Sequence, residues 1–127
     1  MLHNPFTSGV IEPGKIYAGD ENQIVGCYWI KDICKSQDML DLLMEDAQSV
    51  LLNCGVIGGK REMLMAICRD LYDGFVSQYR EEVIDMPLFN FLAYGKYRGN
   101  VVHGRGVTTV FKSYDESGSS PAWFKHK

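Results

Sequence analysis

Residues 98–114, RGNVVHGRGVTTVFKSY, decide how we interpret the fold. Here the apolar pattern changes to a period of two, which predicts strands over residues 101–103 and 107–114. The intervening Gly104, Arg105 and Gly106 suit a tight hairpin or a bulge. Because an isolated hairpin is only marginally stable in water, this strand pair needs further strands to complete a sheet.

The N-terminal part of the chain supplies a second predicted strand pair. Residues 15–18 form one strand, and residues 23–30, QIVGCYWI, form another that is rich in β-branched and aromatic side chains. Both faces of the second strand are largely apolar, which is typical of a central strand covered on two sides. Residues 19–22, GDEN, provide the turn between them.

Three helices are predicted between the two strand pairs, over residues 37–53, 60–79 and 87–94. In each segment apolar residues recur at steps of three and four. Ser36 is the expected N-cap of the first helix, and Gly55 the expected left-handed residue after its end. Asp85 is the expected cap of the third helix, and Pro87 suits its first turn.

The order of strands, helices and strands predicts an α+β fold. We expect a single two-layer domain over residues 1–114, in which an antiparallel sheet from the N-terminal and C-terminal strand pairs packs against two long helices and one short helix. The length of 127 residues suits one domain. Residues 115–127 are predicted to be a flexible Ser/Gly-rich C-terminal tail.

Composition narrows the classes of protein to consider. No apolar run approaches the roughly 18 residues of a membrane-spanning helix, and residues 1–9 lack the features of a secretory signal, so we expect a cytoplasmic protein. The cysteines are therefore expected to be reduced, with Cys54 and Cys68 continuing helical core stripes. The three histidines are scattered, so the sequence predicts neither a metal site nor a cofactor.

Charge is divided unevenly along the chain. Residues 1–85 hold 14 acidic and 7 basic residues, whereas residues 86–127 hold 2 acidic and 6 basic residues. Such a split indicates an anionic ligand or an acidic partner, or else two halves that neutralise each other within the fold.

Four carboxylates of the first predicted helix form the preferred partner-binding site: Asp38, Asp41, Glu45 and Asp46. They lie mostly off the apolar stripe and so present an acidic face to a basic partner. The leading hypothesis is thus a small soluble protein that inhibits or neutralises a macromolecular partner by occlusion, such as an immunity protein, antitoxin or phage-type inhibitor. The expected partner is a protein, for example a basic nuclease or toxin.

The basic C-terminal segment supports two alternative functions. In the first, a small metal-independent RNase or phosphodiesterase uses His103 as general base and Arg98 and Arg105 as cations that stabilise charge on the phosphate. In the second, a nucleic-acid-binding module uses the cations of the basic segment 96–112 together with tyrosine rings for stacking, although the sequence pI of about 5.5 counts against it. Its residues would be Lys96, Arg98, Arg105, Lys112, Tyr94 and Tyr97.

Overall fold

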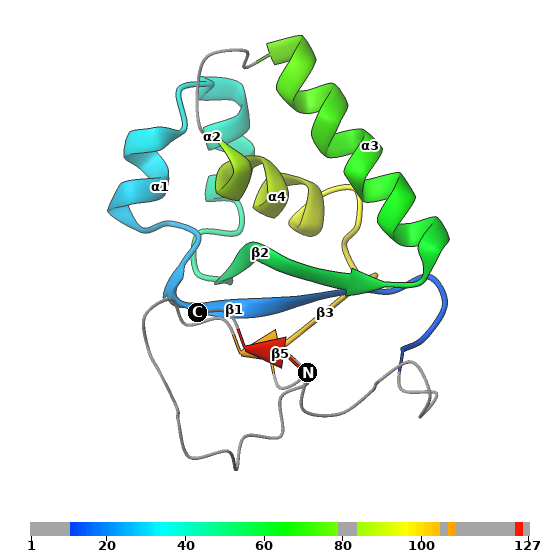
Figure 1. Cartoon of the computed structure of the whole chain (residues 1–127). Coiled ribbons are helices and arrows are strands. Elements are labelled where there is room, and N and C mark those ends of the chain that lie inside the picture. The colour runs from blue at the N-terminus through cyan, green and yellow to red at the C-terminus, as the bar shows by residue number, and fades with distance from the viewer. Residues whose placement is uncertain (1–10, 79–83, 105–106, 109–123, 126–127) are drawn as a thin grey trace.

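The computed structural model describes residues 11–78, 84–104, 107–108 and 124–125. Within them the fold is α+β, with a mixed sheet of three strands in the order β2-β1-β3. Its strands are β1 (Ile16–Ile24), β2 (Val50–Gly59) and β3 (Val101–His103), and its helices are α1 (Tyr28–Ile33), α2 (Gln37–Met44), α3 (Arg61–Gln78) and α4 (Asp85–Tyr94). Figure 1 shows these helices on one side of the sheet.

The sheet is mixed, which corrects the antiparallel prediction. Strand β1 pairs antiparallel with β2 and parallel with β3, where Ala18 lies opposite His103. A parallel neighbour needs a long crossover connection, and here all four helices of the described ranges lie between β1 and β3 in the chain. The predicted strand at residues 101–103 is confirmed in extent.

The predicted N-terminal hairpin is wrong, because β1 runs without a break through the expected turn at residues 19–22, and only residues 23 and 24 of the expected second strand are extended, as the end of β1. Strand β1 ends at Ile24, and the chain then turns, with the amides of Val25 and Gly26 donating to the carbonyls of Ser49 and Ala47 at 2.9 Å. Helix α1 follows immediately. It buries Ile30 completely and leaves Tyr28 82% exposed, so the apolar run is not covered on both sides.

The predicted helix over residues 37–53 is half right. Ser36 caps α2 as expected, its hydroxyl accepting a hydrogen bond from the amide of Met39 at 3.3 Å. Helix α2 ends at Met44, however, and Val50 already belongs to β2, opposite Ile24 of β1. Pairing with β1 satisfies the backbone groups of β2, and both Leu51 and Leu52 are buried in the core.

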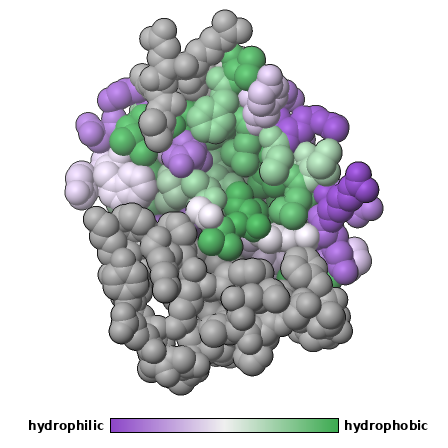
Figure 2. All heavy atoms as spheres, viewed as in Figure 1, coloured by the Kyte–Doolittle hydropathy of each residue, from purple (hydrophilic) through white to green (hydrophobic). Residues whose placement is uncertain are grey.

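Helices α3 and α4 agree closely with prediction. α3 starts one residue later than expected, and α4 starts two residues earlier, so that Asp85 lies in its first turn rather than at the cap position. α4 supplies much of the core: Phe89 is fully buried, and Leu88, Leu92 and Ala93 are nearly so. Figure 2 shows hydrophobic residues gathered over the middle of this face of the molecule.

The C-terminal strand pair differs from prediction. Strand β4 (Val107–Thr108) pairs with β5 (Phe124–Lys125) in a separate parallel pair, and not with β3. Residues 105–106 and 109–123 lie outside the described residues. The predicted turn at residues 104–106 and the predicted strand beyond residue 108 therefore stay predictions. The predicted flexibility of residues 115–127 stays a prediction.

Candidate functional site

The acidic and basic residues singled out in the sequence meet in space. Arg98, which follows α4, donates from Nη2 to Oδ2 of Asp46 at 2.6 Å, just beyond the end of α2. The Asp46 side chain is only 15% exposed, so it is committed to this ion pair. The acidic set of predicted site residues and the basic set are therefore adjacent. One residue of each set, Asp46 and Arg98, is occupied by the ion pair between them.

Lys96 and Tyr97 are joined to a single carboxylate of α3. Lys96 Nζ lies 2.7 Å from Oδ2 of Asp70, and the Tyr97 hydroxyl donates to the same oxygen at 2.5 Å. Burial favours a higher pKa for Asp70, but the hydrogen bonds from Lys96 and Tyr97 and the charge of Lys96 outweigh it and lower the pKa. Burial, the hydrogen bond to Asp70 and its charge raise the pKa of Tyr97 to about 12.

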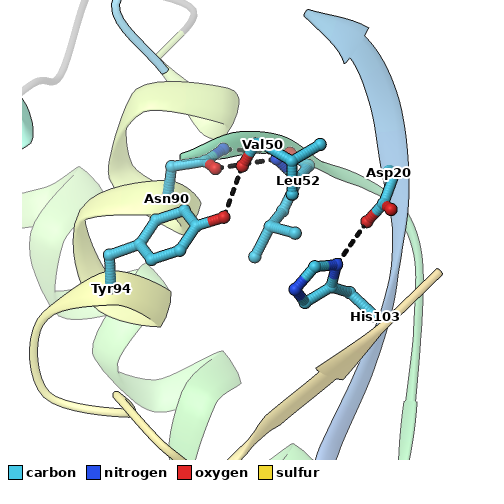
Figure 3. Close-up of polar contacts among 6 residues, drawn as sticks. All are labelled: Asp20, Val50, Leu52, Asn90, Tyr94 and His103. Atoms are coloured by element: carbon cyan, nitrogen blue, oxygen red, sulfur yellow. Dashed lines mark hydrogen bonds and ion pairs between the residues drawn. The ribbon is translucent and has the colours of Figure 1, made fainter. Parts of the chain in front are cut away.

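His103 on β3 faces the carboxylate of Asp20 on the neighbouring strand β1. Its Nδ1 lies 2.6 Å from Oδ1 of Asp20, and the close-up in Figure 3 shows the imidazole ring turned toward that side chain. Both side chains are more than one-third exposed. A carboxylate in this position orients a histidine and favours one tautomer, which is the arrangement of many general bases.

Two of these contacts join the basic C-terminal part of the chain to acids of the N-terminal part. Lys96 and Arg98 each pair with an aspartate from residues 1–85, as expected if the two halves neutralise each other within the fold. The geometry counts against a nucleic-acid patch, since Tyr97 is buried and offers little ring surface for stacking. Arg105 and Lys112 lie outside the described residues.

The other three carboxylates of the predicted acidic face remain at the surface. Asp38, Asp41 and Glu45 are exposed along α2 and its end. Asp41 accepts a hydrogen bond from Nε2 of Gln37 at 2.7 Å, one turn earlier on the same helix. The acidic face of α2 therefore consists of Asp38, Asp41 and Glu45, without Asp46.

A pocket of about 210 Å³ opens beside this acidic face, between α2 and α4. Its walls are mainly apolar, and the Asp46–Arg98 ion pair and Glu45 provide its polar groups. Leu42 is half exposed at the pocket, while Leu43 beside it is buried. The lining residues are Leu42, Leu43, Glu45, Asp46, Phe91, Tyr94, Gly95 and Arg98.

Two polar side chains of α4, which we did not single out as structural supports in the sequence, hold this wall against the sheet. Asn90 is fully buried, accepts from the Leu52 amide and donates to the Leu52 carbonyl, both at 2.9 Å. One turn later the Tyr94 hydroxyl donates to the carbonyl of Val50 (Figure 3). A lone amide inside the apolar run of residues 88–93 was the available sequence signal for Asn90.

Tyr94 serves as a neutral donor here. Burial, followed by the negative charges of Asp20 and Asp46, raises its pKa to about 12. The hydroxyl therefore stays protonated over the physiological range and keeps its hydrogen bond to Val50.

The four cysteines are free thiols. Cys54 lies in β2, and Cys68 is exposed on α3, so neither continues a buried helical stripe as predicted. Burial, together with the charge and hydrogen bond of Asp85, raises the pKa of Cys54 to about 12, so that this thiol is a poor nucleophile at neutral pH.

Among residues 11–78, 84–104, 107–108 and 124–125, no group of three or more His, Cys, Asp or Glu side chains is placed to hold a metal ion. In the same ranges, no helix has the length and apolarity needed to cross a membrane.

Comparisons with family models, curated proteins and solved structures find no match to this chain.

Proposed function

We propose that this is a small binding protein that inhibits or neutralises a macromolecular partner by occluding it. The observation that supports the proposal is the apolar pocket between α2 and α4 beside the exposed carboxylates Asp38, Asp41 and Glu45. A pocket of about 210 Å³ is smaller than the roughly 300–1,000 Å³ typical of small-molecule sites. It suits one anchoring side chain of a larger partner.

The two parts of this surface have different roles in binding. The carboxylates of α2 attract a basic partner and raise the rate of encounter. The pocket beside Leu42 and Tyr94 then buries an apolar anchor, and such central, desolvated contacts carry most of the binding energy in protein complexes. A basic nuclease or toxin that presents an apolar side chain among lysines or arginines is the partner chemistry that fits.

Reversing the acidic face is expected to slow association without unfolding the protein. In the triple variant Asp38→Lys, Asp41→Lys, Glu45→Lys, we expect the association rate with a partner captured from the source cells to fall at least about tenfold at low salt. The difference should shrink at high salt, because exposed charges are screened beyond about 8 Å at physiological ionic strength. Surface plasmon resonance at two salt concentrations measures both effects.

The control is a reversal of three exposed acids elsewhere, Glu12→Lys, Asp32→Lys and Glu62→Lys, which changes net charge equally. It should leave most of the rate intact. A further variant, Leu42→Lys, should speed dissociation instead, because it places a charge at the apolar pocket. An association rate and salt dependence that are equal in the two triple variants would contradict the acidic-face proposal.

A second candidate function, a small phosphodiesterase or RNase, is favoured by one contact, the pairing of His103 with Asp20. In this candidate the neutral imidazole takes the proton of the attacking hydroxyl while Asp20 holds the ring. Arg98 would have to leave Asp46 to reach a phosphate, which counts against it.

We expect purified protein to leave RNA intact. If the phosphodiesterase candidate holds instead, wild-type protein cleaves RNA, His103→Ala loses at least about 100-fold of the rate, and Arg98→Ala is also severely impaired. Gel analysis of a labelled RNA without added metal separates the candidates, with His3→Ala as the control for an unrelated histidine. Cleavage that depends on His103 would replace the binding proposal.

A further inference from the structure

Helix α3 carries more apolar surface than its packing uses. Its inner side buries Ile67 completely and packs the partly buried Leu71 and Phe75 against the core. Its outer side nevertheless exposes Met65 at 53% and Tyr72 at 66%. A surface helix ordinarily shows one apolar stripe and an opposite polar face, so the outer side of α3 is unusual.

The exposed apolar residues form a second stripe along the helix. Met65, Cys68, Tyr72 and Val76 follow at steps of three, four and four residues, and all four are exposed. With 3.6 residues per turn they occupy an arc of about 80° on one side of the helix. This outer stripe, defined by these four residues, has the spacing of a helix-pairing seam.

Two opposite charges border the outer stripe on one edge. Arg69 and Asp73 are exposed and lie four residues apart, on the same side of the stripe. Neither forms an ion pair with another side chain in the described ranges of the chain. Lys96 pairs with Asp70, another acid of α3, and so does not neutralise Asp73.

We propose that α3 pairs antiparallel with α3 of a second copy of this chain, through the outer stripe. In a two-fold pair each edge of one helix faces the same edge of the other. We place the two-fold axis at the level of residue 71 along the helix. Arg69 of one copy then lies level with Asp73 of the second copy, because each of these residues is two positions from residue 71. The edge is thus complementary to itself, with two ion pairs flanking Tyr72.

Tyrosine is well suited to the centre of such an interface. Its ring supplies a large contact area at a low cost in conformational entropy, and it is enriched among residues that dominate binding energy. Met65 and Val76 extend the apolar contact toward the two ends. The pair uses no residue that lines the α2–α4 pocket, so it stands or falls independently of the proposed function.

Oligomeric mass tests the proposal directly. Sedimentation velocity from about 5 to about 500 µM covers the range of a small, weak interface. Wild-type protein should approach the dimer mass at the upper end, whereas Tyr72→Glu should remain a monomer. Val102→Glu, at another exposed apolar residue, is the control and should dimerise like wild type. A wild-type protein that stays monomeric throughout overturns the proposal.

A mixing experiment tests the reciprocal ion pairs. Arg69→Asp and Asp73→Arg each place like charges opposite one another in a homodimer, so each variant alone should dimerise at least about tenfold more weakly. One chain of each kind restores both opposite-charge pairs, so the mixture should form a heterodimer. Like charges within each helix persist in the mixture, so recovery isolates the contact between copies. No recovery in the mixture overturns this pairing.

The exposed thiol of Cys68 reports on the geometry. The two copies of Cys68 lie three positions from the two-fold axis, one on each side, so they are about 9 Å apart along the helix direction at 1.5 Å per residue. A short bis-maleimide should therefore link two wild-type chains, and should not link Cys68→Ser or Tyr72→Glu. Equal crosslinking in Tyr72→Glu would show chance collision and contradict the proposed interface.

Discussion

Asn90→Ala is expected to lower the free energy of unfolding by about 2–5 kcal/mol. Asn90 is fully buried, and its amide pairs with both the N–H and the C=O of Leu52. Its Nδ2 also donates to the carbonyl of Met86 at 2.9 Å. Alanine leaves both backbone groups of Leu52 without their partner, at about 1–3 kcal/mol for each buried group.

This loss is large because the total stability of a domain is about 5–15 kcal/mol. Chemical denaturation with far-UV circular dichroism measures it. Asn22→Ala, at an exposed position of β1, is the control and should change the unfolding free energy by less than about 0.5 kcal/mol. An effect of Asn90→Ala no greater than that of Asn22→Ala would show that the Leu52 contacts contribute nothing.

Asn90→Asp separates hydrogen bonding from side-chain volume. Burial raises the folded-state pKa of this new carboxyl above the unfolded value of about 3.9. The neutral acid, which both donates and accepts, therefore supports the fold below about pH 4, and that support is lost as pH rises through the folded pKa. The deficit relative to wild type at the same pH should therefore be smaller at pH 4 than at pH 7.

Gly74→Val is expected to destabilise the protein by about 3 kcal/mol, through overpacking between α3 and α4. A Cβ atom at Gly74 would lie 2.8 and 2.9 Å from the two Cδ atoms of Leu88. Leu88 is only 3% exposed, so it has little room to move away. A glycine inside a helix costs about 1 kcal/mol relative to alanine, and the close approach of Leu88 is the structural reason for a glycine at this position.

Removing the opposing side chain should recover part of this stability. We expect Leu88→Ala to cost less in the Gly74→Val background than in the wild-type background, because the valine fills space that leucine vacates. Asp73→Val, one residue away and exposed, introduces the same side chain without meeting Leu88 and is the control. Thermal denaturation of wild type, the two single variants and the double variant completes a double-mutant cycle. Additive effects of the two substitutions on stability would contradict the contact between residues 74 and 88.

Both predictions concern α4, which is also the wall of the candidate site. Asn90 and Tyr94 tie this helix to β2, while Leu88 meets α3. The pocket residue Phe91 lies between the two anchors along the helix. The α2–α4 pocket therefore has one wall on a helix that is tied to β2 by two side chains and packed against α3.

The sequence by itself determined the elements whose signals are local. The Ser36 cap, the three-and-four spacing of α3 and the apolar run of α4 act within one or two turns of helix, so their positions followed from residue type. The α+β class and the short strand at residues 101–103 followed in the same way. So did the exposed carboxylates Asp38, Asp41 and Glu45.

Only the tertiary structure decided how distant segments pair. Residues 50–54 fit a helical stripe as well as a strand, and became β2 because β1 offers partners for their backbone groups. The same holds for the parallel register of β1 with β3, and for the turn that ended β1 at Ile24. Arg98 meets Asp46, and His103 meets Asp20, across 52 and 83 positions of chain. Contacts at such separations depend on the packed fold, because no local pattern records which residues a folded chain brings together.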